Sequence, residues 1–416
     1  MHTCLPSTKV LFLRASVPKL RLNPKSTGDG SSMSFGLTRR ELDFQTRARR
    51  FATQRVRPLA EKVERESYFP RELLSAMGRE GLLGAPFSKS DGGLGLGWTS
   101  ETIVAEEVSA ESAATEMARL ASASLYAAPL ANFGNKSQKE KFLVPVLNGE
   151  KVGALALTEP LTGSDAVSIR TRARSDGDGF LLNGEKRFIT NGGVADFLLV
   201  FAVTDPEKPA KSGMSAFVVP KDSRGLTVAK NYSLLGMHGA VVSLLRFQDV
   251  AVPRNNLVGG LNRGFRILLD ELDKERPAVA AGMVGIARSA FEEAVHYSSE
   301  RLQFGKPIRE FEGVSFKIAD MATKLEASRL LIRQAARALD SGRAARKEGA
   351  IAKLFATEAS FEITNEALQV HGGIGYTREL PLERYFRDAR FMMIGGGTSE
   401  IMRFVIQREV YREMHR

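Results

Sequence analysis

The sequence predicts an α+β protein with an N-terminal helical domain, a middle antiparallel β-domain and a C-terminal four-helix bundle. Residues 38–149 show the apolar spacing of helices, and after Lys151 this spacing gives way to short β-rich runs separated by turn residues. After Gly264 the helical spacing returns and continues toward the C-terminus. We therefore divide the chain into a basic leader or tail and three domains, with the bounds 1–36, 37–150, 151–262 and 263–416.

The composition excludes several classes of protein. The longest apolar run, residues 197–203, is far too short to span a bilayer, so no membrane span is expected. One cysteine and five scattered histidines provide neither a disulfide framework nor a metal-ligand spacing, so no metal is expected and any cofactor is expected to be organic. The net charge of +11 comes from basic residues that are not interleaved with aromatic ones, which favours a ligand with several phosphates over nucleic acid.

Residues 1–33 form a basic leader, with five basic side chains against one acidic, that is rich in Ser and Pro and ends at Met33. This pattern is typical of a mitochondrial transit segment. A start codon assigned too far upstream, with Met33 as the true start, and an unstructured tail fit the same residues. We expect a mitochondrial matrix location if the leader is a transit segment, and a cytoplasmic one if the chain is prokaryotic.

The N-terminal domain is predicted from helix start signals. Thr38 is followed three residues later by Glu41, which is the pattern of a capping box, and Pro70 opens a second helix. The glycine-rich residues 91–98 lack the spacing of a dinucleotide-binding loop and follow no strand, so a turn is expected there. Two further helices are predicted over residues 99–107 and 138–147.

The β-domain is predicted from short runs rich in β-branched and apolar residues. The expected strands are residues 152–157, 179–182, 187–190, 197–203, 215–219, 226–229 and 243–247. Turn signals such as Ser175-Asp-Gly and Asn183-Gly separate them. About a hundred residues of this kind between two helical regions predict a small antiparallel domain.

The C-terminal bundle is predicted from four helical patterns, which include residues 265–272, 314–339, 352–370 and 399–411. Within this region Pro277 is expected to open a helix, which places Glu275 and Arg276 at its N-terminus. The small residues that follow would let a flat ligand or another backbone approach closely. By itself, the carboxylate beside a guanidinium fits either a surface ion pair or a catalytic group.

Five motifs in a fixed order point to one family. They are residues 157–165 (LTEPLTGSD), 183–193 (NGEKRFITNGG), 301–306 (RLQFGK), 369–375 (QVHGGIG) and 387–403 (RDAR followed by GGGTSEIMR). With these motifs the chain resembles the acyl-CoA dehydrogenase family over about residues 37–412. The resemblance implies FAD-dependent α,β-dehydrogenation of an acyl-CoA thioester to the trans-2-enoyl-CoA, with an electron-transfer flavoprotein as acceptor.

The resemblance also implies FAD held non-covalently between the β-domain and the bundle. Thr158 would bind the polar edge of the flavin and Phe188 would stack on its ring. The other implied contacts are Leu155, Leu157, Gly163, Ser164, Ile189 and Thr190, with Thr398 and Glu400 near the diphosphate. Arg301, Gln303, Phe304, Gln369 and Gly373 would reach the flavin of a neighbouring subunit, which implies a homotetramer built as a dimer of dimers. Taken singly, Phe188 also fits a core aromatic and Arg301 a surface charge.

The catalytic base departs from the commonest pattern of the family. Many members carry a glutamate directly before the Gly-Thr pair of the last motif, where this chain has Gly396. The long-chain and isovaleryl branches carry it on the bundle helix instead, in a motif that matches LDKER here and makes Glu275 the implied base. Glu275 would take the α-proton while the β-hydride passes to flavin N5. The implied substrate contacts are Ser164, Asp273, Arg276, Gly396 and Gly397.

Two other functions remain open beside the dehydrogenase. A flavin monooxygenase or desulfinase on the same fold needs no α-proton abstraction, and Glu275 beside Arg276 argues against it. A relative that binds flavin or nucleic acid and has lost its chemistry is supported only by the basic charge. Because Gly395 and Gly396 lack side chains, we also expect extra room for a branched or long acyl group.

Overall fold

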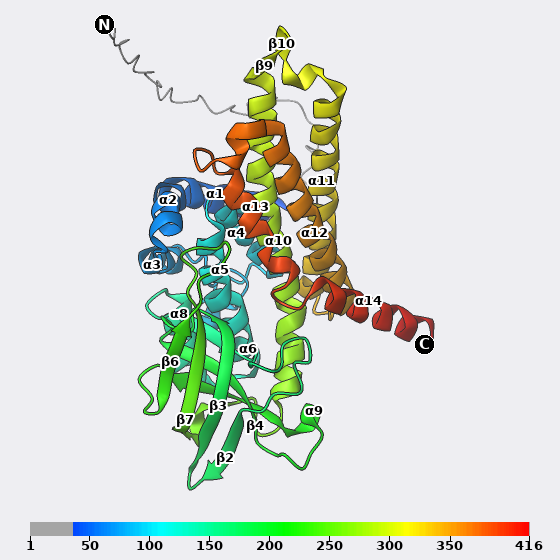
Figure 1. Ribbon diagram of the computed structural model, residues 1–416. Helices are drawn as coiled ribbons and strands as arrows, with labels where there is room; N and C mark the ends of the chain where they lie inside the picture. Colours follow the sequence, from blue (N-terminus) through cyan, green and yellow to red (C-terminus); the bar gives the residue numbers. More distant parts are fainter. Residues whose placement is uncertain (1–35, 416) are drawn as a thin grey trace, which may run out of the picture. The chain divides into compact units, whose positions relative to one another are not determined.

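The computed structural model describes residues 36–415, and the expected leader segment lies outside the described residues. Residues 37–415 belong to one compact unit. Its helices and a mixed β-sheet confirm the predicted fold class (Figure 1). None of the helices within residues 36–415 is long and apolar enough to cross a bilayer.

The N-terminal domain consists of short helices. They are α1 (Arg39–Phe51), η1 (Ala52–Val56), α2 (Arg57–Glu66), α3 (Arg71–Arg79), η2 (Lys89–Asp91), α4 (Trp98–Ser109), α5 (Ala113–Leu120), η3 (Ala121–Tyr126), α6 (Ala127–Phe133), α7 (Lys136–Gln138), η4 (Lys139–Leu143) and α8 (Val144–Leu147). The predicted capping box is confirmed, since Thr38 N–H donates to Glu41 Oε2 at 2.7 Å and Glu41 N–H donates to Thr38 Oγ1 at 3.3 Å. Pro70 is the N-cap of α3, and residues 92–97 form the expected irregular turn.

The sheet lies at one end of the described fold. Its strands are β1 (Gly153–Ala156), β2 (Arg172–Asp176), β3 (Gly179–Thr190), β4 (Phe197–Val203), β5 (Met214–Pro220), β6 (Leu226–Asn231), β7 (Val242–Pro253) and β8 (Leu257–Val258). The order is β6-β7-β3-β2-β4-β5-β8, and β1 pairs with β4. The short segments α9 (Ala210–Gly213) and η5 (Arg254–Asn256) connect strands.

Three details of the sheet differ from the sequence prediction. β1 runs parallel to β4, so the sheet is mixed rather than purely antiparallel. The two strands expected over 179–182 and 187–190 form the single strand β3, because Asn183-Gly184 makes a β-bulge against β7 instead of a turn. β2 was not predicted, because four of its five residues are polar and only Ala173 is buried.

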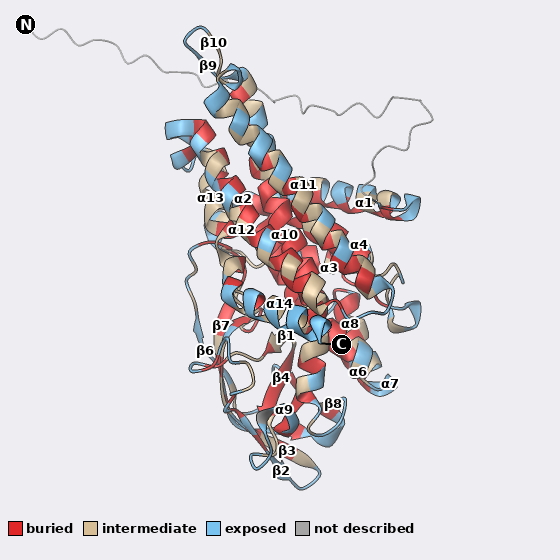
Figure 2. Cartoon of the chain, turned by 90° about the vertical axis from the view of Figure 1, so that its right-hand side faces the viewer, coloured by how far each residue is buried: buried red, intermediate tan, exposed pale blue. Residues whose placement is uncertain are grey.

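The C-terminal domain is built on three long helices. Its elements are α10 (Gly264–Glu300), β9 (Leu302–Gln303), β10 (Lys306–Pro307), η6 (Ile308–Glu310), α11 (Glu312–Asp340), α12 (Arg346–His371), η7 (Gly372–Tyr376), α13 (Leu382–Ala389), η8 (Phe391–Met393) and α14 (Ser399–Met414). α10 packs against α11, α12 and the N-terminal helix α4, while α14 packs on α12. Much of α10 is therefore buried (Figure 2).

The expectation that Pro277 opens a helix is wrong, because this residue lies inside α10. A proline removes one backbone N–H from a helix, yet α10 continues through Pro277, which is itself buried. Gly349 of α12 packs against the proline turn, where an added Cβ would lie 3.5 Å from Arg276 Cβ and 3.6 Å from the Asp273 carbonyl oxygen. Glu275 therefore sits in mid-helix, away from the positive end of the helix dipole.

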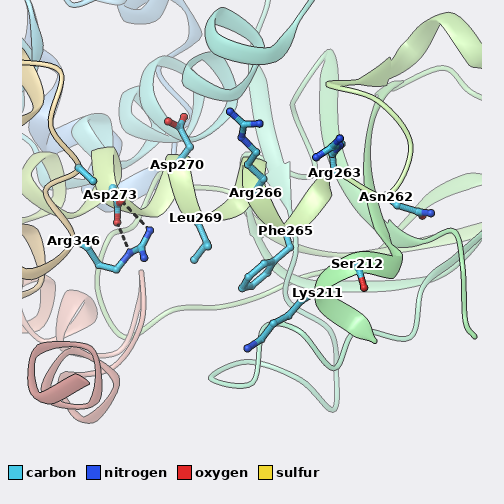
Figure 3. A pocket seen from close by; sticks show the side chains of 11 residues that line it. Lys211, Ser212, Asn262, Arg263, Phe265, Arg266, Leu269, Asp270, Asp273 and Arg346 are labelled. Carbon is cyan, nitrogen blue, oxygen red and sulfur yellow. Dashed lines mark hydrogen bonds and ion pairs between the residues drawn. The ribbon is translucent and has the colours of Figure 1, made fainter. Parts of the chain in front are cut away.

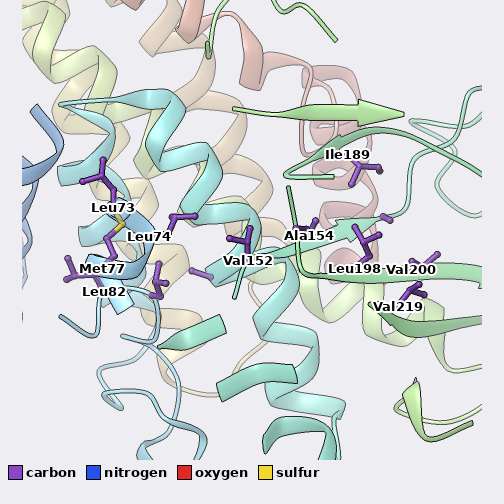
Figure 4. Packing of buried hydrophobic residues seen from close by; sticks show 14 of the residues in the cluster. Leu73, Leu74, Met77, Leu82, Val152, Ala154, Ile189, Leu198, Val200 and Val219 are labelled. Atoms are coloured by element: carbon purple, nitrogen blue, oxygen red, sulfur yellow. The ribbon is translucent and has the colours of Figure 1, made fainter. Parts of the chain in front are cut away.

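A shared hydrophobic core joins the N-terminal helices to the sheet. Leu73, Leu74 and Met77 of α3 belong to the same buried cluster as Val152 and strand residues of β1, β4 and β5 (Figure 4). This packing fixes the loop that follows β1 relative to the helices.

Candidate active site

Glu275 occupies one face of α10 together with Glu271, Ala278 and Gly282. Residues three or four apart share a helix face, and all four of these residues are buried. The Glu275 carboxylate fills the space beside Gly396, since a Cβ added to Gly396 would lie 2.9 Å from Glu275 Oε1. Gly396 and Gly397 have φ angles of +63° and +90°, a left-handed conformation that favours glycine.

The charges around Glu275 come from two helices. Burial raises the pKa of Glu275, while the nearby charges of Arg276 and Lys353 oppose that rise. Burial and the charge of Glu275 also raise the pKa of Glu271 well above its usual range. Lys353 of α12 donates from Nζ to the Gly397 carbonyl oxygen at 2.6 Å, and burial lowers its pKa to about 8. This arrangement suits a carboxylate base poised toward neutral pH.

A wide basic cavity opens beside this site, with a volume of about 490 Å³. Its basic side chains come from the β-domain, α12 and the start of α10, and the acidic Asp270 and Asp273 face them (Figure 3). These basic residues are Lys211, Arg263, Arg266 and Arg346. Asp273 forms ion pairs with Arg346 at 3.4 Å and with Arg276 at 3.8 Å. The cavity suits a polyanionic ligand that also carries hydrogen-bond donors.

A second, nearly closed cavity lies one to two turns beyond Glu275 along α10. Its volume is about 10 Å³, which is the room of one water molecule. Apolar side chains from α5, α10 and neighbouring loops line it, among them the methionines Met117, Met237, Met283 and Met392. Methionine side chains rearrange easily, so this cavity can widen around an acyl chain.

The extra room expected at Gly395 and Gly396 is absent. A Cβ on Gly395 would lie 3.2 Å from Met392 Sδ, and the place beside Gly396 is filled by the Glu275 carboxylate. The absence of a side chain at Gly396 therefore leaves room for the Glu275 carboxylate. Neither Gly395 nor Gly396 leaves empty space for the acyl group of a substrate.

The loop after β1 brings Thr158 to the edge of the sheet and is fixed to β3. Arg187 N–H donates to the Thr158 carbonyl oxygen at 2.7 Å. The buried Lys186 donates from Nζ to the Leu157 carbonyl oxygen at 2.9 Å and to Glu159 Oε1 at 2.8 Å. Glu159 also accepts hydrogen bonds from the backbone of residues 170 and 171, so this buried ion pair holds the whole loop in place.

Phe188 is an exposed aromatic platform near the end of β3. It is 52% exposed, which excludes the interpretation as a core aromatic, and its φ angle is +57°. The Arg187 guanidinium lies 4.5 Å from its ring centroid and the Tyr232 ring lies 4.8 Å from it. Thr162 Oγ1, in the loop after β1, is buried without a hydrogen-bond partner among the described residues. The exposed face of Phe188 fits a flat aromatic ligand.

The remaining predicted contacts fall into three groups. Ile189 is buried in the sheet, and the partly buried or exposed members near Phe188 and Thr158 are Leu155, Leu157, Gly163, Ser164 and Thr190. Thr398 is the N-cap of α14, accepting from Ile401 N–H at 3.3 Å, and Glu400 in the first turn of α14 is exposed.

A third group lies at the far end of the bundle from the sheet (Figure 1). It comprises Arg301, Gln303 and Phe304 at the β9–β10 turn, with Gln369 and Gly373 at the end of α12. Phe304 is 92% exposed. Within one chain this end of the bundle lies away from β3, the strand that carries Phe188 (Figure 1).

Sequence reasoning missed Lys353, Glu271, Lys186 and the basic side chains of the wide cavity. The available signal was modest: Lys353 interrupts the apolar face of α12, and Glu271 precedes Glu275 by four residues, which is one helical turn. The Asp273–Arg346 pair joins residues 73 positions apart and has no local signal.

Comparisons with known proteins cover nearly all of the described chain. Sequence models of the acyl-CoA dehydrogenase N-terminal, middle and C-terminal domains match residues 38–150, 154–250 and 262–411. The human mitochondrial short-chain specific acyl-CoA dehydrogenase is 41% identical over 88% of this chain and 88% of its own length. The butyryl-CoA dehydrogenase structure from Megasphaera elsdenii is 38% identical, with a TM-score of 0.88 over 91% of this chain and 100% of that chain. A structure described as the FAD complex of PigA is 29% identical, with a TM-score of 0.88 over 91% of this chain and 99% of that chain.

Proposed function

The chain belongs to the acyl-CoA dehydrogenase family, and we propose that Glu275 is the base that removes the α-proton of its acyl-CoA substrate. The family assigns the enzyme class, an FAD-dependent oxidoreductase acting on CH–CH bonds. The observation that carries the proposal for Glu275 is its buried carboxylate, which fills the space beside Gly396 on the helix face that also carries Ala278 and Gly282 of the narrow cavity.

The residues near Phe188 fit the flavin of FAD. Phe188 offers a flat face, Thr158 and Thr190 offer hydroxyls at its edge, and the loop that carries Thr158 is held by the buried Glu159–Lys186 pair. FAD, when bound, accepts the hydride that leaves the β-carbon of the acyl chain.

The chain's own part in the reaction is to hold the thioester and move one proton. The α-hydrogen of a thioester is a very weak acid, so its removal needs a strong enough base and a stabilised enolate oxygen. Burial gives Glu275 a raised pKa, and the Gly396 N–H is the donor that we assign to the thioester carbonyl. The rival functions, monooxygenase and desulfinase, have no use for a buried base at this position.

We assign the wide basic cavity to the phosphates and pantetheine of CoA. Lys211, Arg263 and Arg266 supply positive charge, and Asp273 supplies an acceptor for the pantetheine amides. Arg276 holds Asp273 from the buried side, while the exposed Ser164 lies on the loop after β1. The acyl group that we propose is short, as the name of the human relative suggests, and the methionine-lined inner cavity would widen to admit it.

The assembly that we propose is a homotetramer in which the far end of each bundle completes the flavin site of a neighbour. The exposed Phe304, at the end of the bundle that points away from the sheet (Figure 1), supports this arrangement. An electron-transfer flavoprotein is the proposed acceptor, by family resemblance. The proposed compartment is cytoplasmic for a prokaryotic chain, or the mitochondrial matrix if residues 1–33 are a transit segment; the N-terminal mass of the native protein separates the two.

Anaerobic flavin bleaching tests the proposal. The purified yellow protein should lose its flavin absorbance when mixed with butyryl-CoA. Glu275→Gln should retain FAD and bind butyryl-CoA, but reduce its flavin about 10²–10⁴-fold more slowly, which is the usual contribution of a positioned base. Near-normal bleaching by Glu275→Gln would overturn the assignment of the base. Bleaching of the wild type by none of butyryl-, octanoyl- and isovaleryl-CoA would overturn the substrate class.

A further inference from the structure

Lys353 of α12 is a buried cation to which the proposed reaction assigns no step. Its side chain has no exposed surface, although lysine is almost never fully buried without a partner. The one hydrogen bond that residues 36–415 offer it is the contact with the Gly397 carbonyl oxygen. Removing an ammonium group from water is costly, so a single neutral acceptor is a weak reason for this placement.

Lys353 lies near both the Gly396–Gly397 turn, which carries the proposed carbonyl donor, and the proposed base Glu275. The Gly397 carbonyl that it holds is one residue beyond Gly396, where an added Cβ would lie 2.9 Å from Glu275 Oε1. The favourable electrostatic interaction of Lys353 with Glu275 is the largest that opposes its burial. One ammonium group thus acts on the turn that carries the proposed carbonyl donor and on the proposed base.

Resting on the function proposed above, we propose that Lys353 is a positioning residue that holds the Gly396–Gly397 turn beside Glu275 and places its positive charge on the side of the Glu275 carboxylate. It does so from α12, whereas Glu275 lies on α10, so packing of these two helices sets the strength of the base. Lys353 itself touches no reacting atom.

Other charged side chains surround Lys353 and Glu275. Glu275 faces Arg276 and Glu271 on its own helix, and Lys353 faces Arg276, Glu358 of α12 and Glu400 of α14. Arg276 also interacts with Asp273 and Glu271, so its charge is shared among three carboxylates. Lys353 is the cation whose removal changes Glu275 while leaving the Asp273–Arg346 pair beside the CoA cavity in place.

Three substitutions separate the charge from the hydrogen bond. Lys353→Met removes both, Lys353→Gln keeps a donor for the Gly397 carbonyl without the charge, and Lys353→Arg keeps the charge. The pH dependence of flavin reduction by butyryl-CoA should shift upward by about one unit in Lys353→Met and Lys353→Gln, because an opposite charge at close range lowers a carboxyl pKa by about 1–3 units. Lys353→Arg should keep the wild-type profile.

A double-mutant cycle on stability tests the same pair without relying on turnover. The thermal midpoints of the wild type, Lys353→Gln, Glu275→Gln and the double variant are compared at pH 7 with FAD bound. We expect Lys353→Gln to lower the midpoint in the wild-type background and to have little effect beside Glu275→Gln. Should Lys353→Met fail to fold, Lys353→Gln carries the test.

An unshifted pH profile in Lys353→Gln, together with additive midpoints, would overturn the proposal and leave Lys353 as a purely structural support of the turn. Failure of every acyl-CoA to bleach the wild type is a different result. It would overturn the proposed substrate class, and the stability cycle would still decide whether Lys353 and Glu275 are coupled.

Discussion

The Oε1 atom of Glu275 lies 2.9 Å from the position that a Cβ of residue 396 would occupy. The chain therefore cannot carry a side chain at residue 396 and this conformation of Glu275 at the same time. In the family pattern the glutamate stands either before the Gly-Thr pair or on the bundle helix. A side chain at the first position and a glutamate at the second would occupy the same space. In this chain the glycine and the helix glutamate form a matched pair.

Gly396→Ala should therefore displace the proposed base while the fold is retained. The added methyl group would collide with the Glu275 carboxylate, and the φ angle of +63° costs a non-glycine residue about 1–2 kcal/mol. We expect the rate of flavin reduction by butyryl-CoA to fall at least about tenfold, measured by stopped-flow. Gly313→Ala on α11 is the matched control, because nothing lies within 4 Å of its added Cβ; equal rates in the two variants would contradict the pairing.

Elements with strong local signals were predicted well, and those set by tertiary packing were not. The run 197–203 is apolar throughout and is strand β4, and the Thr38–Glu41 box begins α1 as predicted. Pro277 misled the prediction because its helix continues only through burial against α12, which no local pattern reveals. In the candidate site, the motif residues came from family resemblance, whereas Lys353 emerged only once α10 and α12 were packed together.

A buried aspartate predicts a pH-dependent stability. Asp388 accepts a hydrogen bond from Met237 N–H, and burial raises its pKa to about 6 from 3.8. A raised carboxyl pKa means that the folded state favours the proton, so this contribution is present below about pH 4 and is lost as the pH rises through about 6.

Asp388→Asn, a permanent mimic of the protonated form, should therefore raise the free energy of unfolding at pH 8, by at most about 3 kcal/mol. At pH 5 the gain should be about half of that at pH 8, since the folded carboxyl mostly holds its proton while the unfolded one has lost it. Thermal unfolding of both proteins at the two pH values measures the difference. An equal or larger gain at pH 5 than at pH 8 would contradict the assigned direction of the pKa shift.

The proposed assembly predicts that the far end of the bundle controls oligomerisation. Phe304→Asp places a charge on a side chain that is 92% exposed in one chain, so a folded monomer should tolerate it. If this end inserts at a neighbour, the variant should give smaller particles by light scattering and retain less FAD than the wild type. Lys306→Ala is the control, because it changes the same turn without placing a charge on an apolar surface; this variant should keep the wild-type mass and FAD content. An unchanged mass and FAD content in Phe304→Asp would rule out this end as the contact.

Two glycines on α10, three residues apart, should respond oppositely to the same substitution. An added Cβ on Gly282 meets only Glu116 Cγ at 3.6 Å, an ordinary contact at the wall of the inner cavity. On Gly285 it would lie 2.4 Å from the Glu106 carbonyl oxygen, where α10 meets α4. Gly282→Ala should fold with stability equal to the wild type or higher by up to about 1 kcal/mol, because alanine favours a helix interior. Gly285→Ala should lose stability, since backbone must move to admit the methyl group.

The substrate preference of Gly282→Ala then tests where the acyl chain lies. A methyl group in a cavity with room for about one water molecule should reduce the kcat/KM for octanoyl-CoA more than that for butyryl-CoA. One methylene of misfit in a close-fitting pocket is worth about 1–3 kcal/mol, so the ratio of the two values should fall by about tenfold or more. If the ratio is unchanged while Gly282→Ala remains fully folded, the acyl chain does not enter this cavity. In that case the short-chain proposal would lose its structural support, although Glu275 would keep its role as the base.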